Sequence, residues 1–447
     1  MTATTSSPGK AEADLPKRSF CAHNPKWQRF QPTLIVPSEK AAGVALSSQA
    51  KEVYVYQRQY SHVYDQRLAM LKPRCWENLK DESATRVNRI LELANLPDDT
   101  RSMVVGTVVK EAGDPKQDPV HSHTKCRSSD QIYLEDDSGR VALEVDFPHQ
   151  YCTGIVLGAV GIVDHTGTLK VDRIACPHSA APPMLTESSP EQATDEDSCV
   201  LLISNLQCGD ENVSALQREM VLSYVNGHFT KDAKKVARVI VAGGGPSAKN
   251  PLEGSKAFDK WTNHLLKSGV PVDVIPGSKD PTTASWPQRP LHSSLFPKSS
   301  TSNIFSRSPN PYAAEHGNRL VVGTDGENIA DLRKSILQQG SGAGSDDDAA
   351  LSQVTDLQAL SNTLDWAHMC PTGPDSVPTI PHADMDPMVL SQTPHIYFSG
   401  AASKFDTSLA NDQTRLVCVP SFADTGEVVL VNLKSLEVEL LRFRDTN

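Results

Sequence analysis

The second half of the chain alternates uninterrupted apolar segments with segments of helical spacing. The apolar segments read CVLLISNL, VARVIVAGG, VDVIPG, RLVVGTDG and HIYFSG, and they begin at Cys199, Val236, Val272, Arg319 and His395. Strands that are apolar throughout are buried on both faces, and parallel strands of this kind need helical crossovers. Helical spacing between them is clearest over Gly254–Ser268. Residues 199–447 are therefore predicted to form one α/β domain of layered sheets and helices.

Residues 51–180 begin with two segments of helical spacing. The first is expected to end at Pro73, because proline cannot donate a backbone hydrogen bond inside a helix. Its regularly spaced residues are Tyr56, Tyr60, Val63, Tyr64, Arg67 and Leu68. A second helix is predicted over Ser83–Asn95, with Asp81 or Ser83 as its cap. Its apolar face would consist of Val87, Ile90, Leu91 and Ala94.

From residue 102 the pattern changes to short strands. Residues 102–110 form one strand, residues 131–147 form a hairpin that turns at Asp136–Gly139, and two more strands flank His165–Gly167. Short strands of this number, separated by glycine turns, predict a small closed all-β barrel of the OB-fold type. Few aromatic side chains are available there for base stacking, which favours a protein-binding or structural barrel over one that binds nucleic acid.

The remaining segments flank or connect these two domains. Residues 1–50 are rich in Ser, Thr, Pro and Ala and are expected to be poorly structured, and residues 181–198 have the composition of a linker. The acidic stretch around Asp346–Asp348 is predicted to be a surface insertion. The tail from Arg415 predicts three strands in an antiparallel meander that extends the α/β sheet.

Charge and cysteine content restrict the possible partners. The net charge of −11 gives no overall attraction to nucleic acid, although residues 228–267 are locally basic and are either a phosphate contact or a solvated helix face. The nine cysteines include no CxxC pair, which argues against a zinc ribbon or a disulfide framework. His121, His123 and Cys126 lack an evident fourth metal ligand. Without a long apolar run or a signal-like start, a soluble intracellular protein with no membrane partner is expected.

Chemistry in open α/β sheets collects where the strands end. The residues at the predicted strand ends are Asn205, Gln207, Gly244, Ser278, Lys279, Asp280, Ala401 and Ser403. These ends resemble those of calcineurin-like metallophosphoesterases, which place Asp, Asn and His there to hold two metal ions. In this chain neutral side chains or Lys279 stand at the ligand positions, and only Asp280 remains. The resemblance therefore implies a domain without catalytic residues, metal or cofactor.

Two other interpretations of this half stay open. An active phosphoesterase or nuclease would have to recruit atypical ligands, for which the candidates are Asp280, Asp325, His395 and Asp406. The glycines at 243–245 nearly fit a phosphate-binding P-loop. However, Ala248 stands at its second required glycine and Asn250 stands where Ser or Thr binds magnesium.

Several separate blocks, in order over most of residues 53–443, resemble one family. They include YQRQYSHVYDQRLAMLKPRCWENL, VPVDVIPGSKDPTTASWPQRPLHSSLFPKSS, LVVGTDGENIADL, PTGPD and DQTRLVCVPSFADTGEVVLVNLKSL. These blocks look like the small regulatory (B) subunits of eukaryotic DNA polymerase delta; the sister B-subunits of polymerases alpha and epsilon are the alternative. The resemblance implies an OB-fold joined to an inactive calcineurin-like phosphoesterase domain.

The same resemblance implies a function. It suggests a nuclear, non-catalytic scaffold of DNA replication and repair that binds the C-terminal metal-binding domain of the catalytic subunit and a third, extended subunit, and that contacts DNA only weakly or indirectly. Aromatic and arginine residues are enriched at the centres of protein interfaces. The candidate partner-binding residues are therefore those of the first helical segment, Tyr56, Tyr60, Tyr64 and Arg67.

Overall fold

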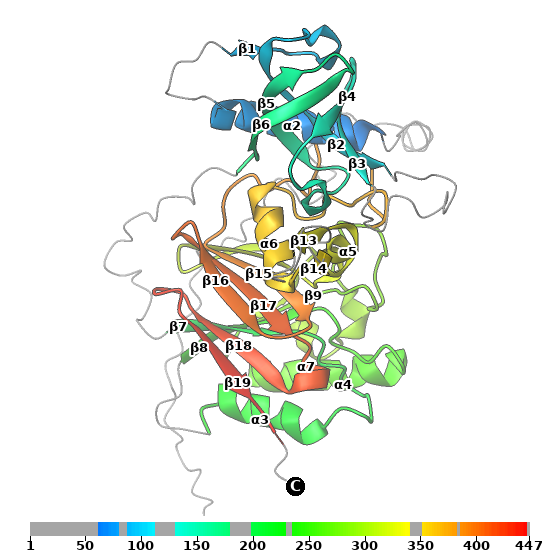
Figure 1. Ribbon diagram of the computed structural model, residues 1–447. Helices are drawn as coiled ribbons and strands as arrows, with labels where there is room; N and C mark the ends of the chain where they lie inside the picture. The colour runs from blue at the N-terminus through cyan, green and yellow to red at the C-terminus, as the bar shows by residue number, and fades with distance from the viewer. Residues whose placement is uncertain are drawn as a thin grey trace, which may run out of the picture.

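The computed structural model describes residues 61–79, 87–111, 130–178, 198–228, 235–339, 351–381 and 385–444. They form a small barrel stacked on a larger α/β part (Figure 1). The predictions for residues 1–50 and 181–197 lie outside the described residues, as do Tyr56, Tyr60, His121, His123, Cys126 and Asp346–Asp348. No helix in the described ranges is long and apolar enough to cross a membrane.

The N-terminal barrel has the five strands that the sequence predicts. They are β2 (Arg101–Glu111), β3 (Gln131–Asp136), β4 (Gly139–Glu144), β5 (Val156–Val163) and β6 (Thr168–Ala175). Strand β2 pairs with both β3 and β5, and β4 pairs with β6, so the sheet closes on itself. The predicted hairpin turn is confirmed, because the Asp136 carboxylate accepts from the backbone N–H groups of Ser138 and Gly139 at 2.9 and 3.2 Å.

Helix α2 (Ser61–Leu79) covers one side of this barrel. The prediction that it ends at Pro73 is wrong, because Pro73 lies inside the helix. It continues for six residues, because Cys75, Trp76 and Leu79 lie on its buried side and join the core of the barrel. Burial of this last turn outweighs the hydrogen bond that proline cannot donate, and Pro73 itself is exposed.

The second predicted helix, Ser83–Asn95, is wrong for the part that the structure describes. Residues 88–89 form a short strand, β1 (Asn88–Arg89), which pairs in parallel with β2, and residues 93–95 form a single 3-10 turn. The barrel fixes this segment: the Ile90 N–H donates to the Met103 carbonyl at 3.0 Å, and the Leu93 N–H donates to the Asp136 carboxylate at 3.1 Å. Leu91, expected on the buried face, is 60% exposed. These tertiary contacts override the helical spacing.

The C-terminal part contains two sheets that pack face to face, as expected for the predicted α/β sandwich. The first has the order β10-β9-β8-β7-β18-β19 and the second the order β11-β12-β15-β17-β16. The first comprises β7 (Ser198–Ile203), β8 (Lys235–Ala242), β9 (Val272–Ile275), β10 (Phe305–Arg307), β18 (Glu427–Asn432) and β19 (Val438–Arg442). The second comprises β11 (Tyr312–His316), β12 (Arg319–Thr324), β15 (Ile396–Ala402), β16 (Asp406–Ala410) and β17 (Thr414–Pro420).

The predicted meander at the C-terminus is corrected by this topology. Strand β17 pairs with β15 and β16 in the second sheet, whereas β18 pairs with β7 and β19 in the first. The short helix α7 (Phe422–Thr425) carries the chain between the sheets. Phe422 anchors this crossover because its side chain is fully buried in the core of the first sheet. The pattern of apolar residues located the strands but could not distinguish a hairpin from a crossover.

Helices cover the outer face of each sheet (Figure 1). Helices α3 (Ala215–Val225) and α4 (Pro251–Lys267) lie on the first sheet, where Phe258 and Trp261 enter its core. Helices α5 (Glu327–Ser335) and α6 (Asp356–Asp365) lie on the second sheet, on the side of the barrel. The predicted insertion begins and ends in a two-stranded hairpin of β13 (Leu337–Gln339) and β14 (Leu351–Gln353). One apolar core runs from the barrel through α5 and α6 to the second sheet.

Candidate functional site

The strand ends singled out in the sequence do meet, and they come from both sheets. A Cβ added to Gly243, after β8, would lie 2.8 Å from Cβ of Asp325, which follows β12. A Cβ added to Gly400, in β15, would lie 2.7 Å from Oγ of Ser204, just after β7. The chain therefore brings these two glycines so close to Asp325 and Ser204 that no side chain fits in their place.

At the first two positions where the resemblance implies metal ligands, Asn205 and Gln207 are hydrogen-bonded to each other, and Asn205 is also hydrogen-bonded to Ser421. Nε2 of Gln207 donates to Oδ1 of Asn205 at 2.6 Å, and Nδ2 of Asn205 donates to Oγ of Ser421 at 2.8 Å. Gly244 stands where a metal-bridging carboxylate would be needed, and a Cβ there would lie 2.4 Å from Oδ1 of Asn205. None of the three residues Asn205, Gln207 and Gly244 supplies an anionic side chain to neutralise a divalent cation, and no side chain fits at Gly244.

Two buried carboxyl groups remain at these strand ends. Oδ2 of Asp280 accepts from the backbone N–H groups of Gly244 and Gly277 at 2.9 and 2.8 Å. Oδ2 of Asp325 accepts from the Ser278 N–H at 3.0 Å, and its Oδ1 accepts from Nδ2 of Asn310 at 2.8 Å. Burial raises the pKa of Asp280 to about 7 and that of Asp325 to about 6. These carboxyl groups fasten loops together, while Lys279 is exposed.

The other candidates for an atypical metal site do not join them. His395 precedes β15 at the opposite end from Gly400, and its Nδ1 accepts from the Leu320 N–H at 3.0 Å. Oδ1 of Asp406 accepts from the N–H of the next residue at 3.0 Å. Ser403, the last of the predicted strand-end residues, donates from its N–H and its hydroxyl to Asp356. Among the described residues, no group of three or more His, Cys, Asp or Glu side chains is placed to hold a metal ion.

The glycine loop before α4 cannot cradle a phosphate in this arrangement. A P-loop needs free backbone N–H groups that point at the ligand. Here the Gly243 N–H donates to the Ile275 carbonyl at 3.1 Å, the Gly244 N–H donates to Asp280, and the Ser247 N–H donates to the Cys208 carbonyl at 2.9 Å. The chain's own acceptors thus occupy these three N–H donors, which a bound phosphate would need.

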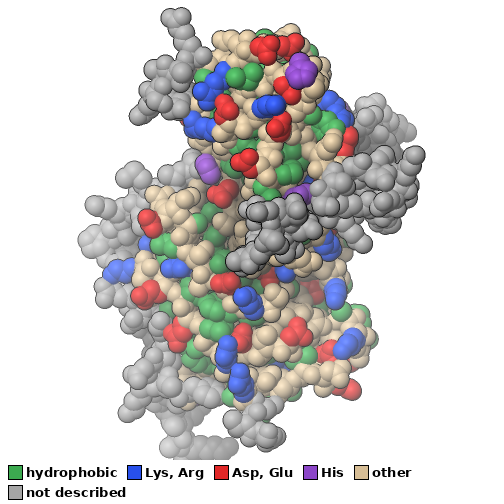
Figure 2. All heavy atoms as spheres, viewed as in Figure 1, with side chains coloured by type: hydrophobic (Ala, Val, Ile, Leu, Met, Phe, Trp, Pro, Cys, Tyr) green, Lys and Arg blue, Asp and Glu red, His purple; other side chains and the backbone are tan. Residues whose placement is uncertain are grey.

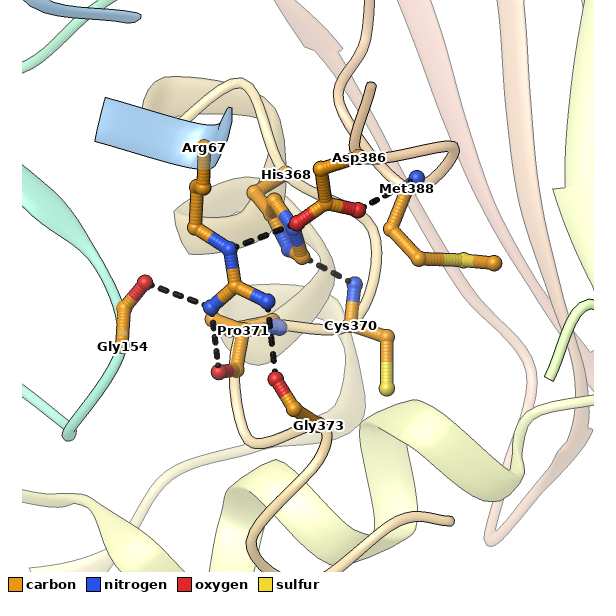
Figure 3. A network of polar contacts seen from close by, with 8 residues as sticks. All are labelled: Arg67, Gly154, His368, Cys370, Pro371, Gly373, Asp386 and Met388. Carbon is orange, nitrogen blue, oxygen red and sulfur yellow. Dashed lines mark hydrogen bonds and ion pairs between the residues drawn. The ribbon is translucent and has the colours of Figure 1, made fainter. Parts of the chain in front are cut away.

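A second candidate site lies at the junction between the barrel and the α/β part, where α2 places Arg67 (Figure 3). Its Nε donates to Oδ2 of Asp386 at 2.7 Å. Its two terminal nitrogens donate to the carbonyls of Gly154, Pro371 and Gly373 at 2.7, 3.0 and 2.8 Å. The side chain is 1% exposed. Arg67 therefore joins the barrel loop to the loop after α6 and has no accessible surface to offer a partner.

Two members of this network, His368 and Asp386, are not evident from the sequence. Nε2 of His368 lies 2.9 Å from Oδ2 of Asp386, the oxygen that also faces Arg67. Burial, followed by the charge of Arg67, lowers the pKa of His368 to about 4, so the imidazole is neutral near pH 7. Of the predicted anchors, Tyr64 is half-buried, with its ring 5.1 Å from the Arg67 guanidinium. No short sequence motif connects Arg67 with His368 and Asp386, because they lie far apart in the chain.

Comparison with known proteins assigns both parts of the chain. Residues 59–174 match the DNA polymerase delta subunit OB-fold domain, and residues 200–407 match the B-subunit family of DNA polymerases alpha and epsilon. A DNA polymerase delta small subunit of Oryza sativa is 33% identical over 72% of this chain and 76% of its own length. The chain belongs to the family of DNA polymerase delta small subunits.

Other members of this family match over nearly their full length. DNA polymerase delta subunit 2 of Drosophila melanogaster is 30% identical over 87% of this chain and 94% of its own length. The small subunit of Saccharomyces cerevisiae is 27% identical over 87% and 90%. The predicted resemblance to the delta B-subunits is thus confirmed.

Solved structures with a similar fold are more distant. The protein TT1561 of Thermus thermophilus is 12% identical, with a TM-score of 0.28 over 55% of this chain and 99% of that one. A dimetal phosphatase from Danio rerio is 13% identical, with a TM-score of 0.26 over 56% of this chain and all of that one. Structural similarities this weak do not indicate any activity for this chain.

Proposed function

We propose that the chain is a non-catalytic accessory subunit of the DNA polymerase delta complex in the nucleus, where it stabilises the catalytic subunit during DNA replication and repair. Family membership supports the assignment to this complex. The observation that carries the non-catalytic role is the geometry of the strand ends. Asn205, Gln207 and Gly244 occupy the positions where the resemblance implies the carboxylate and imidazole ligands of a two-metal centre.

An assay of metal-dependent hydrolysis tests the non-catalytic role. We expect no phosphodiesterase, phosphatase or 3′-exonuclease turnover with magnesium, manganese or zinc, because only Asp280 and Asp325 among the candidate ligands converge. Turnover that copurifies with the protein and disappears in both Asp280→Ala and Asp325→Ala would overturn the proposal. His395→Ala is the matched control, because His395 lies at the other end of β15.

The proposed partners are the C-terminal metal-binding domain of the catalytic subunit and a third, extended subunit. The first would lie near the barrel–phosphoesterase junction, in contact with the segment that contains Tyr56, Tyr60 and Tyr64. Arg67 would act indirectly, by holding the two sides of this junction in place. Residues 321–447 contain 18 acidic and 7 basic residues, and this acidic part of the chain would attract a basic partner segment and raise its rate of association.

A pull-down with the C-terminal region of the catalytic subunit tests this placement. The double variant Tyr60→Ala/Tyr64→Ala should lower the affinity at least about tenfold, as expected when aromatic anchors are truncated. Tyr133→Ala, in the barrel strand β3, should bind normally. Circular dichroism and size-exclusion chromatography establish that the double variant is folded. A folded double variant with unchanged affinity would place the partner on another surface.

DNA is proposed to contact this subunit only weakly. On the face shown in Figure 2, lysines and arginines are interspersed with aspartates and glutamates over both parts of the molecule. The net charge is −11. Single-stranded DNA should therefore bind the isolated protein weakly and dissociate at moderate salt in a fluorescence-anisotropy titration, because binding rests on phosphate neutralisation. Tight, salt-resistant binding would contradict the scaffold role of the barrel.

A further inference from the structure

A surface bend between the loop after α6 and strand β15 presents an exposed serine. The residue before it, Leu390, is buried, and its N–H donates to the Ala367 carbonyl at 2.8 Å, which anchors the bend to the α/β part. Ser391 itself is exposed and lies outside any helix or strand. Its hydroxyl makes no hydrogen bond to the part of the chain that the structure describes. The next residue is Gln392, so the bend presents a Ser-Gln dipeptide to a kinase that selects glutamine after the serine.

A half-buried cation faces this bend from helix α2. Nη1 of Arg74 donates to the Leu390 carbonyl at 2.7 Å, and its Nη2 donates to the Ser391 carbonyl at 3.2 Å. Burial lowers the pKa of Arg74. Within the described ranges, the guanidinium has these neutral acceptors but no carboxylate partner. An anion placed beside Arg74 would therefore be stabilised by the positive charge of the guanidinium, which no carboxylate among the described residues pairs with.

We propose that Ser391 is a phosphorylation site for a glutamine-directed protein kinase and that Arg74 binds the resulting phosphate. The Ser391 carbonyl already lies 3.2 Å from the guanidinium, so a phosphate on the same residue is within reach of it. Arginine is well suited to this task because its planar fork can donate two hydrogen bonds to one phosphate. The site is independent of the strand ends, and Arg74 lies on the same helix α2 as Tyr64 and Arg67.

The reaction transfers one phosphoryl group from ATP. Oγ of Ser391 attacks the γ-phosphorus, and a new O–P bond forms. The bond between the γ-phosphorus and the bridging β–γ oxygen breaks, and ADP leaves with the electron pair. The serine proton passes to the catalytic base of the kinase. A phosphatase reverses the modification by transferring the phosphoryl group to water.

The phosphate would strengthen a contact between the two parts of the chain. Arg74 lies on α2, which packs on the barrel, while the bend belongs to the α/β part. A phosphate carries a charge of about −1.5 to −2 near pH 7, so the present contact to neutral carbonyls would become a charge-assisted one. Phosphorylation would thus reinforce the junction that the Arg67 network already holds.

The first experiment uses the full chain, a purified glutamine-directed kinase and ATP, with phosphosites located by mass spectrometry. The chain contains an internal control: Ser352-Gln353 carries the same dipeptide, but it lies in β14, where Ser352 pairs with Gln338. We expect stoichiometric phosphate on Ser391 and at least tenfold less on Ser352. Gln392→Leu should abolish the modification of Ser391. Absence of phosphate on Ser391, or equal modification of Ser352, would overturn the proposal.

The second experiment tests Arg74 by ³¹P NMR of the phosphorylated protein. The second ionisation of the phosphoserine should occur at a pH lower by roughly 0.5 unit in the wild type than in Arg74→Gln, because the cation favours the dianion. Arg74→Lys should retain most of this shift, and about 0.5 M salt should reduce it in the wild type. The salt dependence keeps the test decisive if Arg74→Gln fails to fold. Identical, salt-insensitive titrations would overturn the role of Arg74.

Discussion

At the scale of single residues, Arg67 and Asp386 form a buried salt bridge between α2 and the loop after α6. Both side chains are almost fully buried, and their distance is 2.7 Å. Replacing one partner of such a pair leaves an uncompensated charge in the interior, which is far more costly than the net value of the intact pair. The pKa of Asp386 is held well below its usual range despite burial, chiefly by the proximity of His368 and Arg67.

Arg67→Met should therefore lower the free energy of unfolding by about 3–5 kcal/mol. The variant strands Asp386 and the carbonyls of Gly154, Pro371 and Gly373. The control is Arg101→Met, because Arg101 forms an exposed pair with Asp172 at 3.2 Å, which is worth at most about 1 kcal/mol. Urea denaturation of both variants measures the difference. Equal losses would show that the buried network contributes nothing special.

A second prediction at this scale concerns pH and Asp280. Because its folded-state pKa is about 7, above the ordinary value of 3.8, the native state keeps a proton that the unfolded chain has released between those values. The contribution of Asp280 to stability therefore falls as pH rises from about 4 to about 7 and is constant above that range. This group can contribute up to about 1.4 kcal/mol per pH unit within the window. The raised pKa of Asp325 acts in the same direction, and the lowered pKa of His368 acts in the opposite direction.

Asp280→Asn should remove the contribution of Asp280 and so make the slope of stability against pH less negative, while keeping an acceptor for the Gly244 and Gly277 N–H groups. The measurement is the free energy of unfolding at several pH values between about 5 and 8, for the wild type and the variant, using urea. Asp172→Asn, on the barrel surface, should retain the wild-type slope. An unchanged slope in Asp280→Asn would mean that the carboxyl is ionised throughout this range.

At the scale of elements, the strands were predictable and their connections only partly so. Uninterrupted apolar runs identified β7, β8, β9, β12 and β15, since no other element buries every side chain over so short a length. The end of α2, the segment at Ser83–Asn95 and the crossover at Phe422 were not predictable. Each of these depends on contacts with segments distant in sequence, such as Asp136 for the Leu93 N–H.

The strand ends were predicted to meet, and their glycines were the useful signal. What the sequence could not reveal is how tightly they meet. A Cβ on Gly400 would lie 2.8 Å from the carbonyl oxygen of Asp325 and 2.9 Å from that of Ala242. These are backbone atoms of neighbouring strand ends, so they cannot move aside as a flexible side chain would.

Gly400→Ala should consequently destabilise the protein by about 1–3 kcal/mol, the usual cost of forcing a methyl group into a filled site. Gly139→Ala is the matched control, because Gly139 also lies in a strand but its added Cβ would be 3.9 Å from the Ala94 nitrogen, the nearest atom beyond its chain neighbours. Thermal unfolding of both variants compares them. A Gly400→Ala protein as stable as the control would show that the strand ends can separate without cost.

At the scale of the whole molecule, the two domains expected from the sequence share one interior. The apolar core that contains Val104 and Ile155 of the barrel also contains Leu332 of α5 and Leu360 of α6. Polar contacts reinforce it, since Nζ of Lys110 in β2 donates to the Ser335 carbonyl at 2.9 Å. The linker composition of residues 181–198 predicts a domain boundary, but composition carries no information about the surface that two domains share.

This shared core makes a prediction about cooperativity. With the barrel and the helix layer buried against each other, exposing either one would uncover the core of the other, so neither can unfold alone at low cost. Calorimetry should show a single transition for the intact protein.

A chain cut at a protease site engineered within residues 181–197 should elute as one particle and still unfold in one transition. The same cut in Arg67→Met should lower the temperature of this transition while the shared core keeps the halves together, because the network that joins Gly154 to Asp386 is gone. Two separate transitions in the intact protein, or separation of the cut wild-type halves at micromolar concentration, would mean that the domains are independent units held together only by the chain.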